Sequence, residues 1–219
     1  MNDKETEDYY RIRAGEYEKI YYREIPERRK EIDDEADRLR ELVQGKRVLE
    51  LACGTGYWTQ VMSETASEIT ALDLWPEMLD VARKKALKCP VHFIVDDMFA
   101  HEYPESAYDA VMVGFWFSHQ PKQEYDRFFD LICKPLKPNG TIWLIDNNPP
   151  AEGTRHELVR MDEYGNSFKK RYLEDGSEHV ILKNYFEESE LRRIFAPRFQ
   201  INALVYGKYY WSVILANTE

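Results

Sequence analysis

Short apolar runs alternate with longer amphipathic stretches between residues 45 and 146. Apolar runs of this length are typical of strands buried on both faces, and apolar residues spaced three or four positions apart are typical of surface helices. Strands that alternate with helices over short connections predict a doubly wound α/β fold with a mostly parallel sheet. The predicted strands are 47–51, 68–72, 91–95, 108–114 and 141–145, and the predicted helices are 57–65, 76–88 and 123–133.

The two flanks of this segment have other patterns. Residues 5–44 are polar and helix-forming, and Pro26 separates two predicted helices, because proline opens a helix more readily than it continues one. Two adjacent strands at the end of the chain predict one antiparallel insertion at the edge of the sheet. The elements predicted after residue 147 are hairpin strands at 169–173 and 179–184, a helix at 187–196 and strands at 201–206 and 208–215.

Composition narrows the classes of function. The chain has 219 residues, of which 43% are hydrophobic, and this suits one domain with a sizeable core. Its 40 acidic and 30 basic residues give a net charge of −10, so no nucleic-acid partner is expected. Three widely spaced cysteines predict neither a disulfide framework nor a metal site and favour a cytoplasmic location. We also expect no signal peptide and no membrane partner, because no apolar run is long enough.

A glycine-containing segment, Glu50-Leu-Ala-Cys-Gly-Thr-Gly56, joins the first predicted strand to a helix. Glycines at such a junction let a ligand approach backbone N–H groups closely. A dinucleotide site requires G-x-G-x-x-G, but Thr59 occupies the third glycine position counted from Gly54. The segment alone leaves a dinucleotide, a nucleoside cofactor without a pyrophosphate, and a tight turn with no ligand as alternatives.

Acidic residues end the next two strands. Asp73 follows Gly54 by about 20 residues, where a carboxylate can accept hydrogen bonds from both ribose hydroxyls. Asp97, after the third strand, is placed to accept from an adenine amino group, and the Met98 backbone can contact the ring edge. The alternative for Asp73 is a helix cap before Pro76. All of these residues stand at carboxyl ends of strands, where open α/β sheets bind ligands.

Three segments resemble the class I S-adenosylmethionine (SAM)-dependent methyltransferases of the small-molecule kind. Ala52 replaces the first glycine of that family's E/D-x-G-x-G-x-G loop, and Asn139 replaces one glycine of its L-K-P-G-G turn. The resemblance implies methyl transfer from SAM, with S-adenosylhomocysteine (SAH) as the product. The segments are Val48-Leu-Glu-Leu-Ala-Cys-Gly-Thr-Gly56, Leu72-Asp-Leu-Trp-Pro-Glu-Met-Leu79 and Leu136-Lys-Pro-Asn-Gly140.

The resemblance also implies a fold and a set of cofactor contacts. The fold is a seven-stranded sheet whose last strand is antiparallel, with an N-terminal helical lid. Leu74 would pack on the adenosine and Phe115 would lie beside the cofactor. The segment from Tyr10 to Tyr17 resembles a Y-x-x-x-A-x-x-Y helix over the methionine end, and a plain surface helix is the alternative. The expected cofactor-binding residues are Tyr10, Arg13, Tyr17, Glu50, Ala52, Gly54, Gly56, Asp73, Leu74, Met78, Asp97, Met98 and Phe115. The expected single domain, 1–219, comprises a helical cap (1–44), a cofactor-binding core (45–146), a substrate-side insertion (147–185) and a C-terminal helix with two strands (186–219).

Methyl transfer from a sulfonium is an in-line displacement, and a general base is needed only when the acceptor must lose a proton. His119 follows the fourth predicted strand, and an unperturbed imidazole titrates near neutrality, so His119 is the candidate catalytic base. The alternative is a loop histidine that only binds the backbone. Tyr22, Trp116 and His119 are the substrate-binding candidates. The aromatic residues around them suit an aromatic or cationic small molecule, and the acceptor atom stays open.

Other functions compete with this interpretation. Asn148-Pro-Pro-Ala151 resembles the N-P-P-Y motif of amino-methylating enzymes, but it lacks the aromatic residue and follows the fifth strand instead of the fourth. The alternatives are an RNA or protein methyltransferase, a nonenzymatic SAM-binding protein and an NAD-dependent enzyme. The expected assembly is a monomer or a homodimer.

Overall fold

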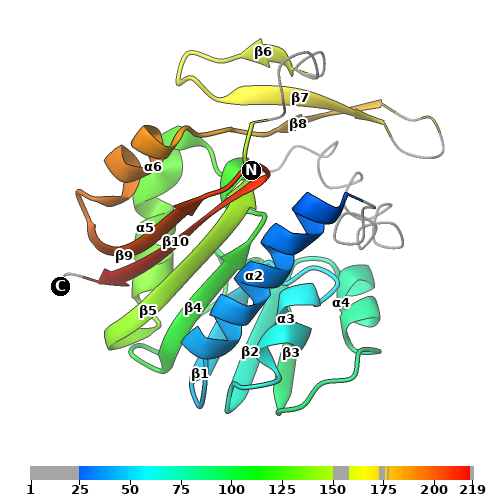
Figure 1. Cartoon of the computed structure of the whole chain (residues 1–219), viewed down its shortest axis with the longest axis vertical. Coiled ribbons are helices and arrows are strands. Elements are labelled where there is room, and N and C mark those ends of the chain that lie inside the picture. The colour runs from blue at the N-terminus through cyan, green and yellow to red at the C-terminus, as the bar shows by residue number, and fades with distance from the viewer. Residues whose placement is uncertain (1–24, 150–157, 173–175, 177, 218–219) are drawn as a thin grey trace.

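The computed structural model describes residues 25–149, 158–172, 176 and 178–217. The strands of its main sheet are β1 Arg47–Leu51, β2 Glu68–Asp73, β3 Val91–Val95, β4 Tyr108–Gly114, β5 Leu136–Asn147, β9 Phe199–Tyr206 and β10 Tyr210–Asn217. The helices are α2 Pro26–Leu42, α3 Tyr57–Met62, α4 Pro76–Ala82, α5 Tyr125–Cys133 and α6 Glu188–Phe195, with 3₁₀ turns η2 Phe117–His119 and η3 Lys122–Glu124 (Figure 1). Within the described ranges, no helix is both long and apolar enough to cross a membrane.

The main sheet has seven strands in the order β3-β2-β1-β4-β5-β10-β9. Neighbours from β3 to β5 are parallel, and β10 is antiparallel to both β5 and β9. The predicted doubly wound sheet with an antiparallel last strand is therefore confirmed. The prediction that the antiparallel strand lies at the edge is wrong. Trp211, Val213 and Leu215 of β10 are fully buried, whereas most of β9 is only half-buried, so the more apolar strand takes the interior position.

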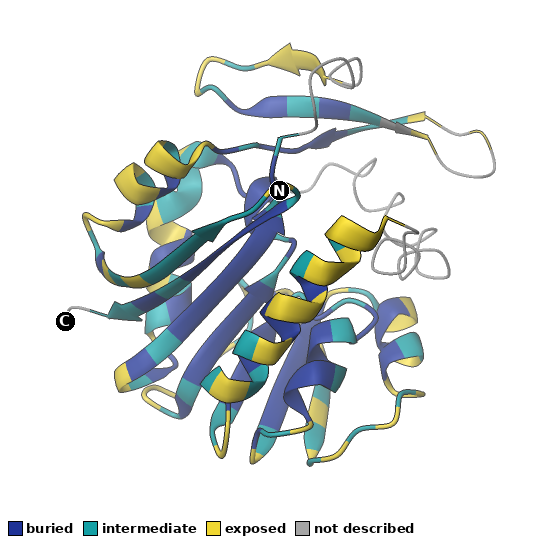
Figure 2. Ribbon diagram, in the orientation of Figure 1, coloured by how far each residue is buried: buried dark blue, intermediate teal, exposed yellow. Residues whose placement is uncertain are grey.

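Side chains alternate along the strands between two hydrophobic cores. In β4, Ala110 and Met112 face a core shared with α2, α3 and α4. Val111 and Val113 face a second core, shared with α5 and α6. Figure 2 shows the central strands buried beneath helices whose outer faces are exposed. Burial on both faces explains why these strands read as continuous apolar runs in the sequence.

Two helices are shorter than predicted. The helix predicted to reach residue 65 ends at Met62, and the one predicted to reach residue 88 ends at Ala82. After Ala82, the N–H groups of Lys84 and Lys85 donate to carbonyls three residues back, at 3.1 Å each. These tighter turns satisfy the last carbonyls and end the helix.

The turn predicted at residues 137–140 is part of β5. Asn139 has a φ of +61°, and the register with β4 shifts between Tyr108 and Ala110. A Cβ on Gly140 would lie 2.5 Å from the Leu136 side chain, so glycine permits this close approach. The turn residues therefore form a bulge within a longer strand.

The predicted substrate-side insertion forms a separate three-stranded sheet, here called the arm sheet. It consists of β6 Leu158–Met161, β7 Ser167–Tyr172 and β8 Glu178–Leu182. β7 and β8 make the predicted hairpin, in which Phe168 lies opposite Leu182. The sequence did not predict β6, because all four of its residues are exposed and show no alternation. Figure 1 shows the arm sheet beyond the end of the main sheet where β5 finishes.

Candidate functional site

The loop between β1 and α3 has the backbone conformation that its glycines suggest. Gly54 and Gly56 have φ values of +56° and +77°, and Ala52 also adopts a positive φ, of +52°. A Cβ on Gly56 would lie 2.8 Å from the Cβ of Ala82, so only glycine fits against α4. Ala52 therefore occupies, with some strain, a conformation that glycine adopts without cost.

Asp73 lies at the end of β2 and binds this loop. Its Oδ2 accepts the N–H of Gly54 at 2.8 Å, and its Oδ1 accepts the N–H of Trp75 at 2.9 Å. Its side chain is buried, and burial raises the pKa of the carboxyl to about 6 despite these hydrogen bonds. Each oxygen of an ionised carboxylate can accept a second hydrogen bond, so the geometry leaves room for ribose hydroxyls.

Glu50 lies beneath the same loop. It is 2% exposed, and Thr59 donates a hydrogen bond to its Oε2 at 2.5 Å. Burial raises the pKa of Glu50 to about 8; the Thr59 hydrogen bond lowers it, and the charge of Asp73 raises it further. Thr59 stands where a dinucleotide loop has its third glycine, so here that position supports a buried acid.

Thr55 is a loop residue that the sequence analysis missed. Its side chain is 1% exposed, and its Oγ1 has no hydrogen-bond partner among the described residues. An orphaned buried hydroxyl in a glycine loop fits a polar ligand group, because unsatisfied buried groups cost free energy. The sequence offered no signal for it beyond its place between Gly54 and Gly56.

The predicted adenosine contacts lie at the ends of β2 and β3. Leu74 is 43% exposed although it is apolar, whereas Met78 and Met98 are buried. Asp97 accepts the N–H of Phe99 at 2.9 Å, so it also caps the turn that follows. The structure brings these residues to the same end of the sheet as Asp73.

Phe115 and Trp116 follow β4. Phe115 has a φ of +56° and packs edge-on against Tyr210, with ring centroids 5.5 Å apart. Trp116 stacks on Phe128 at 5.4 Å and is half-buried. Tyr10, Arg13, Tyr17 and Tyr22, the predicted contacts of the N-terminal cap, lie outside the described residues.

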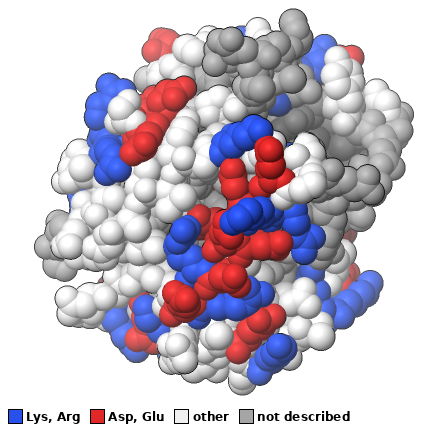
Figure 3. All heavy atoms as spheres, viewed as in Figure 1, with Lys and Arg blue, Asp and Glu red and all other residues white. Residues whose placement is uncertain are grey.

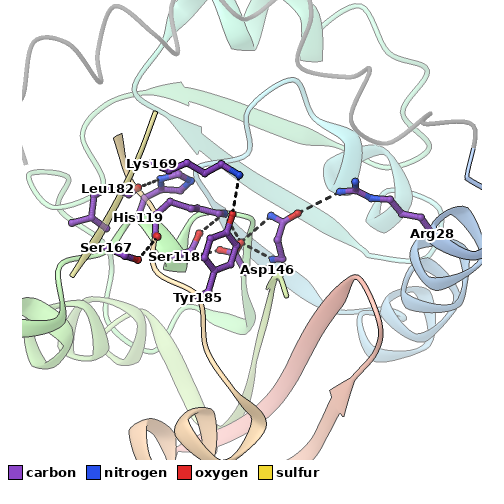
Figure 4. A network of polar contacts seen from close by, with 10 residues as sticks. Arg28, Ser118, His119, Asp146, Ser167, Lys169, Leu182 and Tyr185 are labelled. Carbon is purple, nitrogen blue, oxygen red and sulfur yellow. Dashed lines mark hydrogen bonds and ion pairs between the residues drawn. The ribbon is translucent and has the colours of Figure 1, made fainter. Parts of the chain in front are cut away.

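His119 is held by the arm sheet. Its side chain is buried in the 3₁₀ turn after β4, and its Nδ1 lies 2.7 Å from the carbonyl oxygen of Leu182 (Figure 4). A carbonyl only accepts hydrogen bonds, so Nδ1 carries the proton. The basic lone pair of the neutral ring is then on Nε2.

A buried ion pair lies beside His119. The Lys183 ammonium contacts Asp146 Oδ1 at 2.9 Å and donates to Ser118 Oγ at 2.5 Å, and the pair is almost wholly buried. Burial works to raise the pKa of Asp146, but the charges of Lys183 and His119 and the hydrogen bonds outweigh it, so the pKa lies below its ordinary value. The sequence pattern gave no indication of a role for either residue. Asp146 ends the fifth strand, but Lys183 is far from it along the chain.

Comparisons with known proteins show which proteins this chain resembles. A family described as a methyltransferase domain matches residues 48–140. Demethylmenaquinone methyltransferases from Thermus thermophilus and Deinococcus radiodurans are 33% and 34% identical over 112 and 120 residues, which are 49% and 53% of this chain. The chain spans about half the length of these curated relatives, 50% and 49%.

Solved structures resemble the chain over more of its length than the curated relatives do. A DhpI–SAH complex superposes with a TM-score of 0.77 at 27% identity, covering 99% of this chain and 97% of that one. A DhpI–SAM–HEP complex gives the same TM-score at 26% identity, covering 97% and 96% of the two chains. A Burkholderia thailandensis 1,6-didemethyltoxoflavin-N1-methyltransferase shares the fold alone, with a TM-score of 0.61 at 17% identity over 97% and 90% of the chains. The DhpI likeness covers nearly the whole chain and includes complexes with SAM and SAH, and residues 48–140 match a methyltransferase domain, so this chain is similar to SAM-dependent methyltransferases over its core and to SAM-binding proteins over nearly its whole length.

Proposed function

We propose that this protein transfers the methyl group of SAM to a small-molecule acceptor held beside the ends of β4 and β5. The observation that carries the proposal is His119, buried beside the cofactor end of the sheet with its Nδ1 fixed by Leu182. SAM supplies an electrophilic methyl group on a sulfonium. The acceptor's lone pair would form the bond to the methyl carbon as the carbon–sulfur bond breaks, and the electron pair of that bond would stay on sulfur.

The loop after β1 and the ends of β2 and β3 would hold the cofactor. Asp73 would accept the ribose hydroxyls and Asp97 the adenine amino group, while Leu74 packs on the adenosine. The buried Thr55 hydroxyl and the positive-φ backbone of the loop support this placement. We propose that the cofactor site also includes Glu50, Ala52, Gly54, Gly56, Met78, Met98 and Phe115. The methionine end of the cofactor would be contacted by Tyr10, Arg13 and Tyr17.

His119 would take the proton of an acceptor that must lose one. The Leu182 carbonyl keeps the hydrogen on Nδ1, so Nε2 is the proton acceptor. Trp116 and Tyr22 would line the acceptor site, and the arm sheet would help to exclude water from it.

Aromatic and basic side chains near the proposed acceptor site both bear on the chemical class of the acceptor. Aromatic residues favour an aromatic or cationic acceptor, but the basic side chains beside Asp146 weigh against a cation. A nucleic acid is also disfavoured. Figure 3 shows acidic and basic side chains intermingled along α2, where Arg29–Asp33 and Lys30–Asp34 pair at 3.0 and 2.6 Å. We keep a cytoplasmic location and a monomeric or homodimeric assembly as proposals.

Calorimetry with SAH and turnover measurements test these roles separately. Asp73→Asn should weaken SAH binding about 10-fold or more, because a carboxylate oxygen is lost, whereas Asp80→Asn on the exposed face of α4 should not. Unchanged SAH affinity in Asp73→Asn would refute the ribose contact.

The role of His119 needs a different readout. His119→Ala should keep SAH affinity nearly intact and lower turnover about 100-fold for a protic acceptor, as expected for loss of a general base. The control is His92→Ala, an exposed histidine on β3. Turnover equal to that of the unsubstituted enzyme at every pH would remove His119 from the reaction.

A further inference from the structure

The turn after β3 contains a histidine–aspartate contact that the proposed function does not use. His101 Nδ1 lies 2.8 Å from Asp96 Oδ2, and the His101 side chain is 23% exposed. An ionised carboxylate only accepts hydrogen bonds, so Nδ1 carries the proton and donates it. This hydrogen bond lowers the pKa of Asp96 below its ordinary value, so the carboxylate is ionised at neutral pH.

Asp96 connects His101 to the residue expected to bind the adenine. Its other carboxylate oxygen, Oδ1, accepts the N–H of Asp97 at 2.8 Å, and its own N–H donates to the carbonyl oxygen of Asp73 at 3.1 Å. Asp73 is the residue proposed to bind the ribose, and Asp97 the residue proposed to bind the adenine amino group. Asp96 therefore links the two halves of the proposed adenosine site.

Asp97 begins a tightly bonded turn. Its Oδ1 accepts the N–H of Phe99 at 2.9 Å, and its carbonyl oxygen accepts the N–H groups of Ala100 and His101, also at 2.9 Å. Its side chain is exposed. Each oxygen of an ionised carboxylate can accept a further hydrogen bond, so Asp97 can also receive one from the adenine amino group.

Tyr103 supports the next residue of the turn. Its hydroxyl donates to the carbonyl oxygen of Met98 at 3.1 Å, and both side chains are 8% exposed. The His101 ring packs edge-on against the Tyr103 ring, with centroids 4.8 Å apart. The Met98 backbone is expected to contact the edge of the adenine. His101 therefore contacts the supports of both residues that would recognise the base.

Recognition of a base depends on where this turn is held. A hydrogen bond weakens steeply once its donor angle falls below about 120°, so a small displacement of the turn is enough to lose it. Discrimination between bases comes from polar groups that the wrong base leaves unpaired. A turn that can move adapts to either base, whereas a restrained turn cannot.

We propose that His101, through Asp96, positions the turn after β3 so that Asp97 and Met98 select an adenine base in the cofactor. His101 is a positioning residue, because it acts through Asp96 and not through a contact of its own with the cofactor. This inference rests on the proposed cofactor contacts and adds the residues that hold them in place. The competing explanation is that His101 and Asp96 only stabilise a surface turn.

Calorimetry with two ligands separates these explanations. The ligands are SAH and S-inosylhomocysteine, in which a carbonyl oxygen replaces the adenine amino group. The unsubstituted enzyme should prefer SAH by about 10-fold or more in dissociation constant, because S-inosylhomocysteine offers Asp97 no donor. His101→Phe keeps a ring against Tyr103 but removes the donor to Asp96. It should weaken SAH binding about fivefold and S-inosylhomocysteine binding less than about twofold, so the preference falls.

Two further variants serve as controls. His101→Asn places an amide N–H near the position of Nδ1 and should restore most of the preference for SAH. His92→Phe removes a histidine of β3 whose Nε2 lies 2.9 Å from Glu68, away from the turn. It should leave both affinities within about twofold of those of the unsubstituted enzyme.

A double variant tests whether His101 acts through Asp96. Asp96→Ala should lower the preference for SAH at least as much as His101→Phe, and the double variant should lower it no further than Asp96→Ala alone. Losses that add would overturn the proposal. If His101→Phe does not fold, Asp96→Ala still decides the outcome, because an undiminished preference for SAH in that variant would also overturn it.

An equal preference for SAH in His101→Phe and the unsubstituted enzyme would overturn the proposal, whatever the change in the thermal midpoint. Failure of the proposed cofactor site is distinguishable from this result. Equal affinity of the unsubstituted enzyme for the two ligands would refute the Asp97 contact, and no binding of either ligand would refute the proposed function.

Discussion

Ala52 stands in a backbone conformation that suits glycine. Its φ of +52° places its Cβ close to the following carbonyl, a strain of about 1 to 2 kcal/mol for a residue with a side chain. The position matches the first glycine of the loop in class I methyltransferases, so a positive φ is expected there. This chain has alanine at that position instead of glycine.

Ala52→Gly should therefore stabilise the protein by about 0.5 to 1 kcal/mol, less than the full strain, because glycine also gains entropy in the unfolded chain. Urea denaturation measures this change. Ala36→Gly, at a buried position in α2, is the control and should destabilise by about 1 kcal/mol or more, because it lowers helix propensity and also removes a methyl group from the core. Destabilisation by Ala52→Gly of similar size would contradict the strain argument.

Glu50 links stability to pH. Burial raises its pKa from 4.5 to about 8, so the folded protein keeps a proton that the unfolded chain releases. The free energy of unfolding should then fall as pH rises from about 4.5 to about 8, by up to about 1.4 kcal/mol per pH unit.

Glu50→Gln should remove the contribution of Glu50 to the dependence of the free energy of unfolding on pH. Compared with the unsubstituted protein, the variant should therefore be more stable at pH 8 than at pH 5. Urea denaturation of the ligand-free enzyme across this range tests it, with exposed Glu102→Gln as the control. A slope unchanged by Glu50→Gln would show that Glu50 is ionised in the folded state.

At the scale of elements, the Lys183–Asp146 pair joins the arm sheet to β5. Removing one partner of a buried pair leaves an uncompensated charge, so Lys183→Met should cost about 3 to 5 kcal/mol. Lys170→Met, at an exposed pair on the same sheet, should leave the thermal midpoint close to that of the unsubstituted protein. Similar midpoints for both variants would show that the buried pair does not anchor the arm sheet.

The hydrophobic pattern of the sequence predicted helices and strands wherever the burial of their side chains follows a regular period. β1, β2 and β4 read as apolar runs because both faces are buried, and helix α5 has a clear apolar side. The exposed strand β6 gave no such signal. The interior position of β10 depends on contacts between distant segments, which local periodicity does not encode.

The residues of the candidate site also divide into those that the sequence predicted and those that it did not. Loop and strand-end residues such as Gly54 and Asp73 are close in sequence to recognisable elements, so they could be predicted. Lys183 directly follows β8 of the arm sheet, far along the chain, and only the structure places it beside Ser118 and Asp146.

At the scale of the whole molecule, the glycine-containing loop and the buried Lys183–Asp146 pair lie at the same end of the main sheet but at different strands. The loop lies at the ends of β1 and β2, whereas His119, Asp146 and Lys183 lie at the ends of β4 and β5 and beneath the arm sheet. In the proposed function, this arrangement would place the methyl donor and the methyl acceptor side by side at the same end of the sheet, as transfer between two bound molecules requires.

The most direct test of methyl transfer to a small molecule is mass spectrometry after incubating the protein with isotopically labelled SAM and a panel of small-molecule acceptors. We predict a small-molecule product that carries the labelled methyl group, formed by the unsubstituted protein and greatly reduced in His119→Ala. Label found only in added RNA or protein, or in no product although SAH binds, would contradict it.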